Sequence, residues 1–224
     1  NTFPSQYSSS ISSSPIVLTQ KKSLPNVTLT NIQPKNSFTI DYIELNKKYI
    51  ASLPNLHSTK MAGNFMPLKS IVDLWSRIQA GDISAKNDYE KQIILLKENA
   101  DAGDVRAQMD YAMFLFMDAT GKIDGNLFER RVALASEAKE YYIQAAVKGQ
   151  TEAAKAIGTH VVQKPIADTV ESLSWIFISQ KMGGNINAKY ICEKSLTPCT
   201  EDMFVKALDR ATMYIDFYEF KHVE

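Results

Sequence analysis

The sequence contains few histidines and cysteines, and it has no recognisable arrangement of catalytic or metal-binding residues. Its three histidines, His57, His160 and His222, have no second histidine or cysteine at a spacing used by metal ligands. Glycine is also scarce, with 9 residues in 224, and neither a phosphate-binding loop nor a dinucleotide fingerprint is present. We therefore expect a protein that is not an enzyme and that binds no cofactor and no metal.

An excess of charge and a long apolar run are also missing. The 25 lysines and arginines balance the 25 aspartates and glutamates, so the formal net charge is zero. Proteins that bind nucleic acids normally carry a basic excess, so we expect no nucleic-acid partner. No apolar stretch approaches the roughly 18–20 residues of a membrane-spanning helix, so no integral membrane span is predicted either.

Cysteine is limited to Cys192 and Cys199, seven positions apart. Two residues cannot supply the four ligands of a structural zinc site, and the spacing is not the C-x-x-C of redox motifs. A disulfide is the favoured interpretation, and two ordinary thiols in a cytosolic protein are the alternative. Because the chain begins at Asn1 and not at Met, we also expect that a leader has been removed. Both features predict a periplasmic or secreted protein, with a cytoplasmic location as the alternative.

The neutral total conceals two unlike segments. Residues 1–60 hold six lysines against two acidic residues, whereas residues 61–224 hold 19 basic and 23 acidic residues. Seven of the first fourteen residues are serine, and five prolines in the first segment prevent long helices. We predict a Ser/Pro-rich basic arm over 1–60, extended or partly helical, and a helical domain over 61–224. The arm is a candidate for self-association.

The pattern of apolar residues is helical from Pro67 onward, without a strand-like run bounded by hairpin signals. Within the arm, apolar residues between Phe38 and Leu53 recur at helical spacing, although residues 38–42 also alternate as in a strand. We favour a helix there. Further helices are expected over residues 68–80, 83–100, 104–118, 127–147, 151–163, 168–182, 186–195 and 201–221.

The pattern G-x3-A occurs four times between these predicted helices. The copies run from Gly81 to Ala85, Gly103 to Ala107, Gly149 to Ala153 and Gly184 to Ala188. A glycine ends a helix with a positive φ, and a small alanine lets the next helix pack closely. The pattern alone is not specific, so its surroundings decide its meaning.

Those surroundings repeat at an interval of about 34 residues, a period typical of helical repeat proteins. Tyr141 and Trp175 occupy equivalent places, since each lies eight residues before a glycine. The alanines Ala153 and Ala188 recur at nearly the same interval. With the Ala-Ala-x-x-Gly turn that ends at Gly149, residues 100–195 resemble the Sel-one-like repeat family, α/α solenoids related to tetratricopeptide repeats.

The chain also departs from that family. The step from Ala107 to Ala153 is longer than one repeat of this kind by about ten residues. The resemblance is weak over 67–99 and absent from 1–60. Some exported members close each helix pair with a cysteine pair, but here only the last repeat has one, Cys192 and Cys199.

The resemblance implies an all-α superhelical solenoid preceded by the arm. It also implies a scaffold or adaptor that binds other proteins, of the kind exported bacterial members provide in envelope or secretion-system assembly. The alternative is an immunity or inhibitor protein that binds a toxin or enzyme partly through its basic arm. A third hypothesis is an envelope enzyme with an unrecognised site.

The C-terminal helix has two interpretations. An apolar stripe from Phe204 to Tyr218 is typical of a helix that caps a solenoid. Phe217 and Phe220 lie off that stripe, which makes them candidates for a partner surface. Carboxylates on the helices have bases three or four positions away, so we expect them on solvent-exposed faces.

Overall fold

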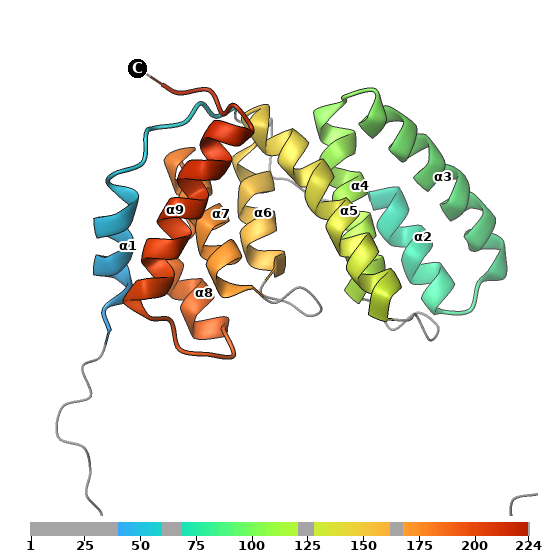
Figure 1. Cartoon of the computed structure of the whole chain (residues 1–224). Coiled ribbons are helices and arrows are strands. Elements are labelled where there is room, and N and C mark those ends of the chain that lie inside the picture. The colour runs from blue at the N-terminus through green and yellow to red at the C-terminus, as the bar shows by residue number, and fades with distance from the viewer. Residues whose placement is uncertain (1–39, 60–68, 121–127, 162–167, 224) are drawn as a thin grey trace, which may run out of the picture. The chain divides into compact units, whose positions relative to one another are not determined.

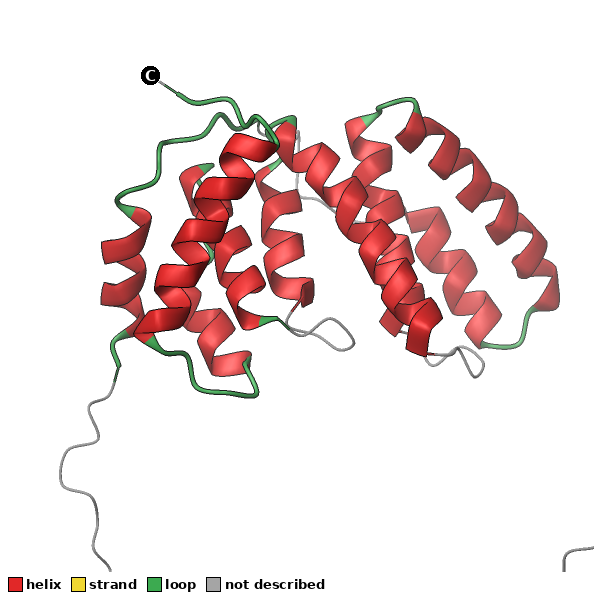
Figure 2. Cartoon of the chain, viewed as in Figure 1, coloured by secondary structure: helices red, strands yellow, loops and turns green. Residues whose placement is uncertain are grey.

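The computed structural model describes residues 40–59, 69–120, 128–161 and 168–223. Within these ranges the chain is all-helical, with nine α-helices and no β-strand (Figures 1 and 2). The helices are α1 (Tyr42–Ile50), α2 (Lys69–Gln79), α3 (Ile83–Asp101), α4 (Val105–Thr120), α5 (Phe128–Val147), α6 (Thr151–Val161), α7 (Thr169–Lys181), α8 (Ala188–Lys194) and α9 (Glu201–Phe217). The prediction of an all-helical chain is confirmed for these residues.

Helices from α2 to α7 pack against each other in chain order. Each contacts its neighbours in this series, and α7 then contacts both α8 and α9. Helix α7 is the centre of the C-terminal half, since Leu173 and the four residues from Trp175 to Ile178 have no exposed surface. The apolar residues of the sequence thus form one core that runs between neighbouring helices.

Four connections between helices have the same geometry, and a glycine makes each possible. Gly81, Gly103, Gly149 and Gly183 have φ between 86° and 97°. Each glycine N–H donates to the carbonyl three residues earlier at 2.8–3.0 Å, and the following N–H donates to the carbonyl five residues earlier at 2.8–3.1 Å. This is the Schellman motif, which requires a left-handed residue that glycine adopts without steric cost.

The predicted role of Gly184 is wrong, because Gly183 is the residue with the positive φ. Gly184 serves a different purpose, since a Cβ at this position would lie 2.8 Å from the Ser179 carbonyl oxygen. It therefore permits close approach of the chain to the end of α7. The alanines after the turns, Ala107, Ala153 and Ala188, are buried, as close packing of the next helix requires.

Part of the predicted arm belongs to the helical body. The compact unit begins at Thr39, so the boundary predicted between residues 60 and 61 lies too late in the chain. Leu53 and Leu56 are 4% and 3% exposed and belong to the core, because apolar burial outweighs the proline-rich composition of this segment. Residues 1–39 of the arm lie outside the described residues.

The segment 40–59 contacts the last two helices and the turn between α5 and α6. Asp41 caps α1, which is the helix predicted within the arm. Lys48 pairs with Glu201 of α9 at 2.7 Å, and the Asn46 side chain accepts the backbone N–H of Ala188 at the start of α8. Beyond α1, the N–H of Thr59 donates to the carbonyl of Gly149 at 2.8 Å. Helix α1 thereby covers α8 and α9.

Helix α9 packs its apolar stripe against α7 and α1. Phe204, Ala207, Ala211 and Ile215 are buried on this face. The ring of Phe204 lies 6.0 Å from that of Phe177 in α7 and also contacts tyrosines of α1. The predicted helix over 201–221 is thus present, with its end at Phe217.

Candidate interaction surface

Tyr141 joins three consecutive helices. Its hydroxyl, on α5, donates to the carboxylate of Asp101 at the end of α3. Lys97 of α3 donates to the same hydroxyl at 3.2 Å, and the ring meets that of Tyr111 of α4 edge-on at 4.9 Å. The aromatic residue predicted from the repeat therefore acts as a packing and hydrogen-bonding residue and is only 7% exposed.

Trp175, the equivalent aromatic residue of the next predicted repeat, has a charged partner of its own. Its indole N–H donates to Glu171 at 2.8 Å, one turn earlier on α7. Glu171 also accepts the hydroxyl of Tyr214 at 2.6 Å and a guanidinium N–H of Arg210 at 3.1 Å, both from α9. Lys139 of α5 pairs with it at 2.5 Å. These five residues, the Glu171 cluster, connect α5, α7 and α9.

Glu171 is charged in spite of its burial, with only 6% of its side chain exposed. Burial opposes the carboxylate form, but hydrogen bonds from Lys139 and Tyr214 and the positive charge of Lys139 outweigh it. The pKa of Glu171 therefore lies below its usual value. Burial and the hydrogen bond to Glu171 raise the pKa of Tyr214, so its hydroxyl stays a donor.

Two carboxylates correct the expectation that acidic side chains lie on exposed faces. Glu171 is one, and Asp110 of α4 is the other, with 2% of its side chain exposed. Asp110 accepts a hydrogen bond from Arg106 at 2.8 Å, but burial dominates and raises the pKa of Asp110. Both lie on a side of their helix that is covered by neighbouring parts of the chain.

The histidines make no metal site among the described residues. His57 and His222 are exposed. His160 of α6 stacks on Phe116 of α4, with ring centroids 4.0 Å apart and planes 4° apart, and its ring lies 5.4 Å from that of Tyr142. Burial lowers the pKa of His160 to about 4, so the imidazole is neutral and serves as a packing residue.

Cys192 and Cys199 form a disulfide, with Cα atoms 5.4 Å apart. Cys192 lies in α8 and Cys199 just before the N-cap of α9, so the bond fixes the connection between the two helices. Both sulfur-bearing residues are buried, whereas Leu196 in the enclosed loop is 81% exposed. The disulfide thus holds an exposed loop on a buried base.

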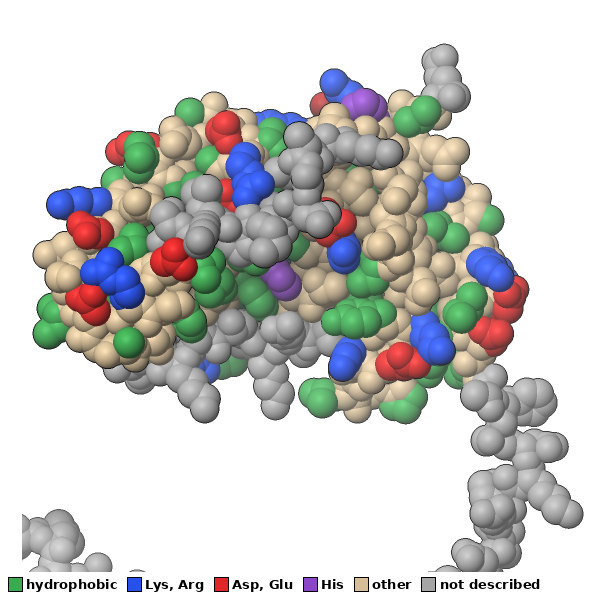
Figure 3. Space-filling model, turned by 180° about the vertical axis from the view of Figure 1, so that it is seen from behind, with side chains coloured by type: hydrophobic (Ala, Val, Ile, Leu, Met, Phe, Trp, Pro, Cys, Tyr) green, Lys and Arg blue, Asp and Glu red, His purple; other side chains and the backbone are tan. Residues whose placement is uncertain are grey.

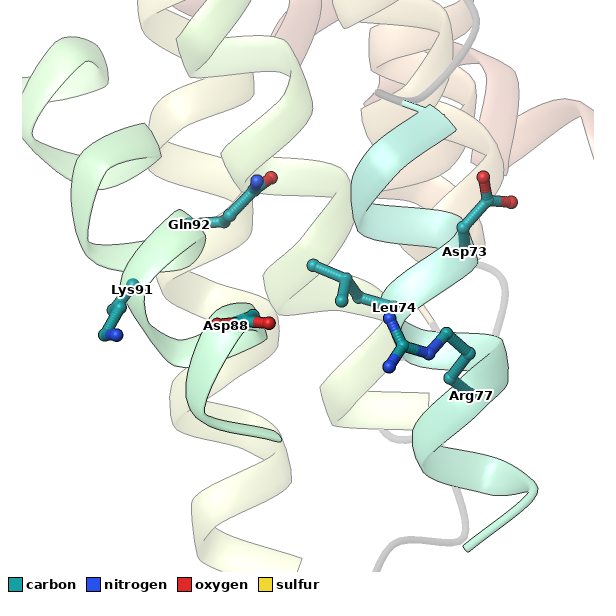
Figure 4. Close-up of a pocket in the computed structure, with 6 residues that line it drawn as sticks. All are labelled: Asp73, Leu74, Arg77, Asp88, Lys91 and Gln92. Atoms are coloured by element: carbon teal, nitrogen blue, oxygen red, sulfur yellow. The ribbon is translucent and has the colours of Figure 1, made fainter. Parts of the chain in front are cut away.

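Two of the open grooves on the described residues are lined by charged side chains. One, of about 440 Å³, lies between α2 and α3; Leu74 projects between the helices, with Asp73 and Arg77 on one side and Asp88, Lys91 and Gln92 on the other (Figure 4). The second, of about 380 Å³, lies between the start of α7 and α9 and is lined by Asp168, Val170, Lys206, Asp209, Arg210 and Met213. Both combine charges of opposite sign, as does the face in Figure 3.

The second groove adjoins the exposed side of α9. Phe217 is 74% exposed and Met213, one turn earlier, is 54% exposed. Together with Lys206, Asp209 and Arg210 they make the α9 surface. The exposure of Phe217 agrees with the prediction that it lies on an accessible surface.

The prediction for Phe220 is wrong, because this residue is 5% exposed. After α9 the chain turns at Glu219, whose φ is 55°, and directs Phe220 inward. Its ring centroid lies 6.4 Å from that of Trp175. Phe220 therefore belongs to the core.

Comparisons of the chain with protein-family models, with curated proteins and with solved structures found no match. None of the described helices has both the length and the apolar character of a membrane-spanning helix.

Proposed function

We propose that this protein is a non-enzymatic scaffold or adaptor that binds other proteins. The observation that carries the proposal is the series of helices joined by identical glycine turns, in which Gly149 follows Tyr141 at the same interval as Gly183 follows Trp175. Helices packed in chain order bury their core between neighbours and leave long surfaces for partners. We interpret the array as a short solenoid of Sel-one-like repeats.

The disulfide supports a periplasmic or secreted location. Disulfides persist in oxidising compartments and are rare in the cytosol. The Cys192–Cys199 bond is buried at its base, which is typical of a structural disulfide. We propose that the protein acts as an adaptor in bacterial envelope or secretion-system assembly.

The α9 surface is the partner-binding site that we propose. Aromatic residues, methionine and arginine are enriched at protein interfaces, where other charged residues surround the apolar centre as a polar rim. Phe217→Asp should abolish recovery of the partner without unfolding the chain, since the side chain contributes little to the core. Leu196→Asp is the matched control, because this residue is also strongly exposed, at 81%, but lies in the loop between α8 and α9.

The test is affinity capture from an envelope fraction, with quantitative mass spectrometry of wild type and both variants. We expect a protein enriched by wild type and by Leu196→Asp, and lost with Phe217→Asp. Equal recovery by all three would contradict the assignment of the α9 surface.

The alternative is an immunity or inhibitor protein that acts through the arm. Residues 1–38 contain three lysines and no acidic residue, which suits an acidic cleft of a toxin or enzyme. A deletion that tests this must end at residue 38, because Leu53 and Leu56 belong to the core. Loss of binding on this deletion would favour the inhibitor, and unchanged binding would favour the adaptor.

A further inference from the structure

Both basic residues of α9 already have acidic partners within the chain. Lys206 pairs with Asp202 at 2.6 Å. Arg210 contacts Asp168 at 3.0 Å and Glu171 at 3.1 Å. The helix holds four acidic residues against these two bases. Its positive charges are therefore neutralised by the chain itself, and an excess of carboxylates remains.

The carboxylates without partners lie on the same face of α9 as its exposed apolar side chains. Asp209 precedes Met213 by four residues and Asp216 follows it by three, so helical spacing places the three on one side of the helix. Asp209 and Asp216 are exposed, and neither has an ion pair in the part of the chain that the structure describes. Phe217, four residues after Met213, is 74% exposed. This face therefore combines unpaired negative charge with apolar surface.

The C-terminal end of α9 makes the same face more attractive to a cation. Its last turn contains no basic residue, although the helix dipole favours a positive charge there. Asp216 and, just beyond the helix, Glu219 are exposed instead, without an ion pair in the described ranges. The exposed ring of Phe217 follows Asp216 directly and meets the ring of Tyr218 edge-on at 4.9 Å. Carboxylates, helix dipole and aromatic ring all attract a positive charge.

We propose that the α9 surface binds a basic amphipathic segment of its partner, whose apolar side chains cover Met213 and Phe217. Lysine or arginine side chains of that segment pair with Asp209 and Asp216. These carboxylates are seven residues apart, which is about 10 Å along the helix. A partner helix with two bases seven residues apart and apolar residues between them matches this distance. The inference rests on the proposed function, because it specifies the chemistry of the partner that the α9 surface binds.

Charge complementarity selects a basic segment over an acidic one. Asp209, Asp216 and Glu219 leave a negative excess even when Lys221 of the following tail is counted against them. An acidic segment would bring like charges together at this face, which opposes binding. It would also have to displace the carboxylates that already engage the bases of α9.

The test measures the binding of two synthetic helical peptides to the full chain by fluorescence anisotropy. Both peptides consist of alanine and leucine with charged residues seven positions apart, and they differ only in that one carries lysine and the other glutamate. We expect the lysine peptide to bind at least about tenfold more tightly than the glutamate peptide. High salt should weaken binding of the lysine peptide, because it screens charges at an exposed surface.

Charge reversal locates the binding site. The double variant D209K/D216K should bind the lysine peptide at least about tenfold more weakly than wild type and should prefer the glutamate peptide. The matched control is D73K/D88K, since Asp73 and Asp88 are also exposed carboxylates without an ion pair in the described part of the chain. This control changes the net charge equally but lies in the groove between α2 and α3, so it should retain the preference for the lysine peptide.

The proposal is overturned by a wild-type chain that binds both peptides equally or binds neither. It is also overturned if D73K/D88K weakens binding as much as D209K/D216K does. Circular dichroism of each variant verifies the fold, and the exposed position of the changed residues predicts unchanged helix content.

Affinity capture separates this proposal from the proposed function. A captured protein that is lost with Phe217→Asp but retained by D209K/D216K would leave the scaffold role intact and overturn the basic partner. A wild-type chain that shows the expected peptide preference but captures no specific protein would contradict the scaffold role alone.

Discussion

Replacing Glu171 by glutamine should destabilise the protein far more than the loss of an exposed ion pair does. The carboxylate contacts Lys139 at 2.5 Å, Arg210 at 3.1 Å and Tyr214 at 2.6 Å, with 6% of its side chain exposed. Glutamine keeps the volume and one acceptor oxygen but leaves two cations without their shared anion. Breaking a buried pair by removal of one partner costs about 3–5 kcal/mol.

The local geometry places the expected loss near the lower end of that range. The Lys139 and Arg210 side chains are 28% and 34% exposed, and Arg210 keeps its contact with Asp168 at 3.0 Å. We therefore expect a loss of about 3 kcal/mol in the free energy of unfolding at pH 7. Because the pKa of Glu171 is lowered, its contribution is present above the unfolded-state pKa and is lost as pH falls.

The assay is urea denaturation followed by circular dichroism. Asp202→Asn is the control, since its pair with Lys206 is 67% and 62% exposed and should contribute less than about 0.5 kcal/mol. Adding Lys139→Met to Glu171→Gln should recover part of the loss, because it removes one unpaired cation. A cost below about 1 kcal/mol for Glu171→Gln, or no recovery, would refute this account of the cluster.

Three further predictions use the same assay. Replacing Cys192 and Cys199 by serine opens a loop of eight residues and should cost about 2–3 kcal/mol, and a reductant should then have no further effect. The pKa of His160 is about 4 in the folded protein, below its unfolded-state value, so the stability that the neutral imidazole provides is present above the unfolded-state pKa and is lost as pH falls. Between pH 7.5 and 5 the free energy of unfolding of wild type should fall by about 2 kcal/mol more than that of His160→Phe. Equal losses would disprove this role of His160. Gly149→Ala should cost more than the roughly 1–2 kcal/mol of Gly81→Ala, because only the first brings a Cβ to 3.0 Å from a backbone nitrogen; equal costs would contradict this.

The sequence predicted the helices well because their signals are local. Apolar periodicity placed eight helices after residue 67, and the helical spacing around Tyr42 and Tyr49 located α1. Where a signal depended on contacts between distant residues, prediction was less successful. Leu53 and Leu56 are buried by residues far from them in sequence, so the predicted end of the arm, at residue 60, was placed too late in the chain.

The turn near residue 184 shows the limit of a short motif. G-x3-A aligns Gly184 with the other turns, but two adjacent glycines compete for the left-handed position. The interval between Tyr141 and Trp175, applied to Gly149, selects Gly183 instead. Spacing across the whole repeat was therefore more informative than the motif.

Charged residues were the largest omission. The spacing of apolar residues does not show whether a charged residue such as Glu171 is buried. Its partners Lys139 and Arg210 lie on α5 and α9, far from it in sequence. The available signal was a single carboxylate placed four residues before the apolar run from Trp175 to Ile178. Phe220 was missed for a similar reason, because the turn at Glu219 that directs it inward contains no glycine.

The central claim, that the chain is a scaffold for another protein, is tested most directly by quantitative affinity capture with wild type and the Phe217→Asp variant. We predict one protein that wild type enriches and that Phe217→Asp fails to recover, with both chains equally folded by circular dichroism. Recovery of no specific protein by folded wild-type chain would contradict the claim.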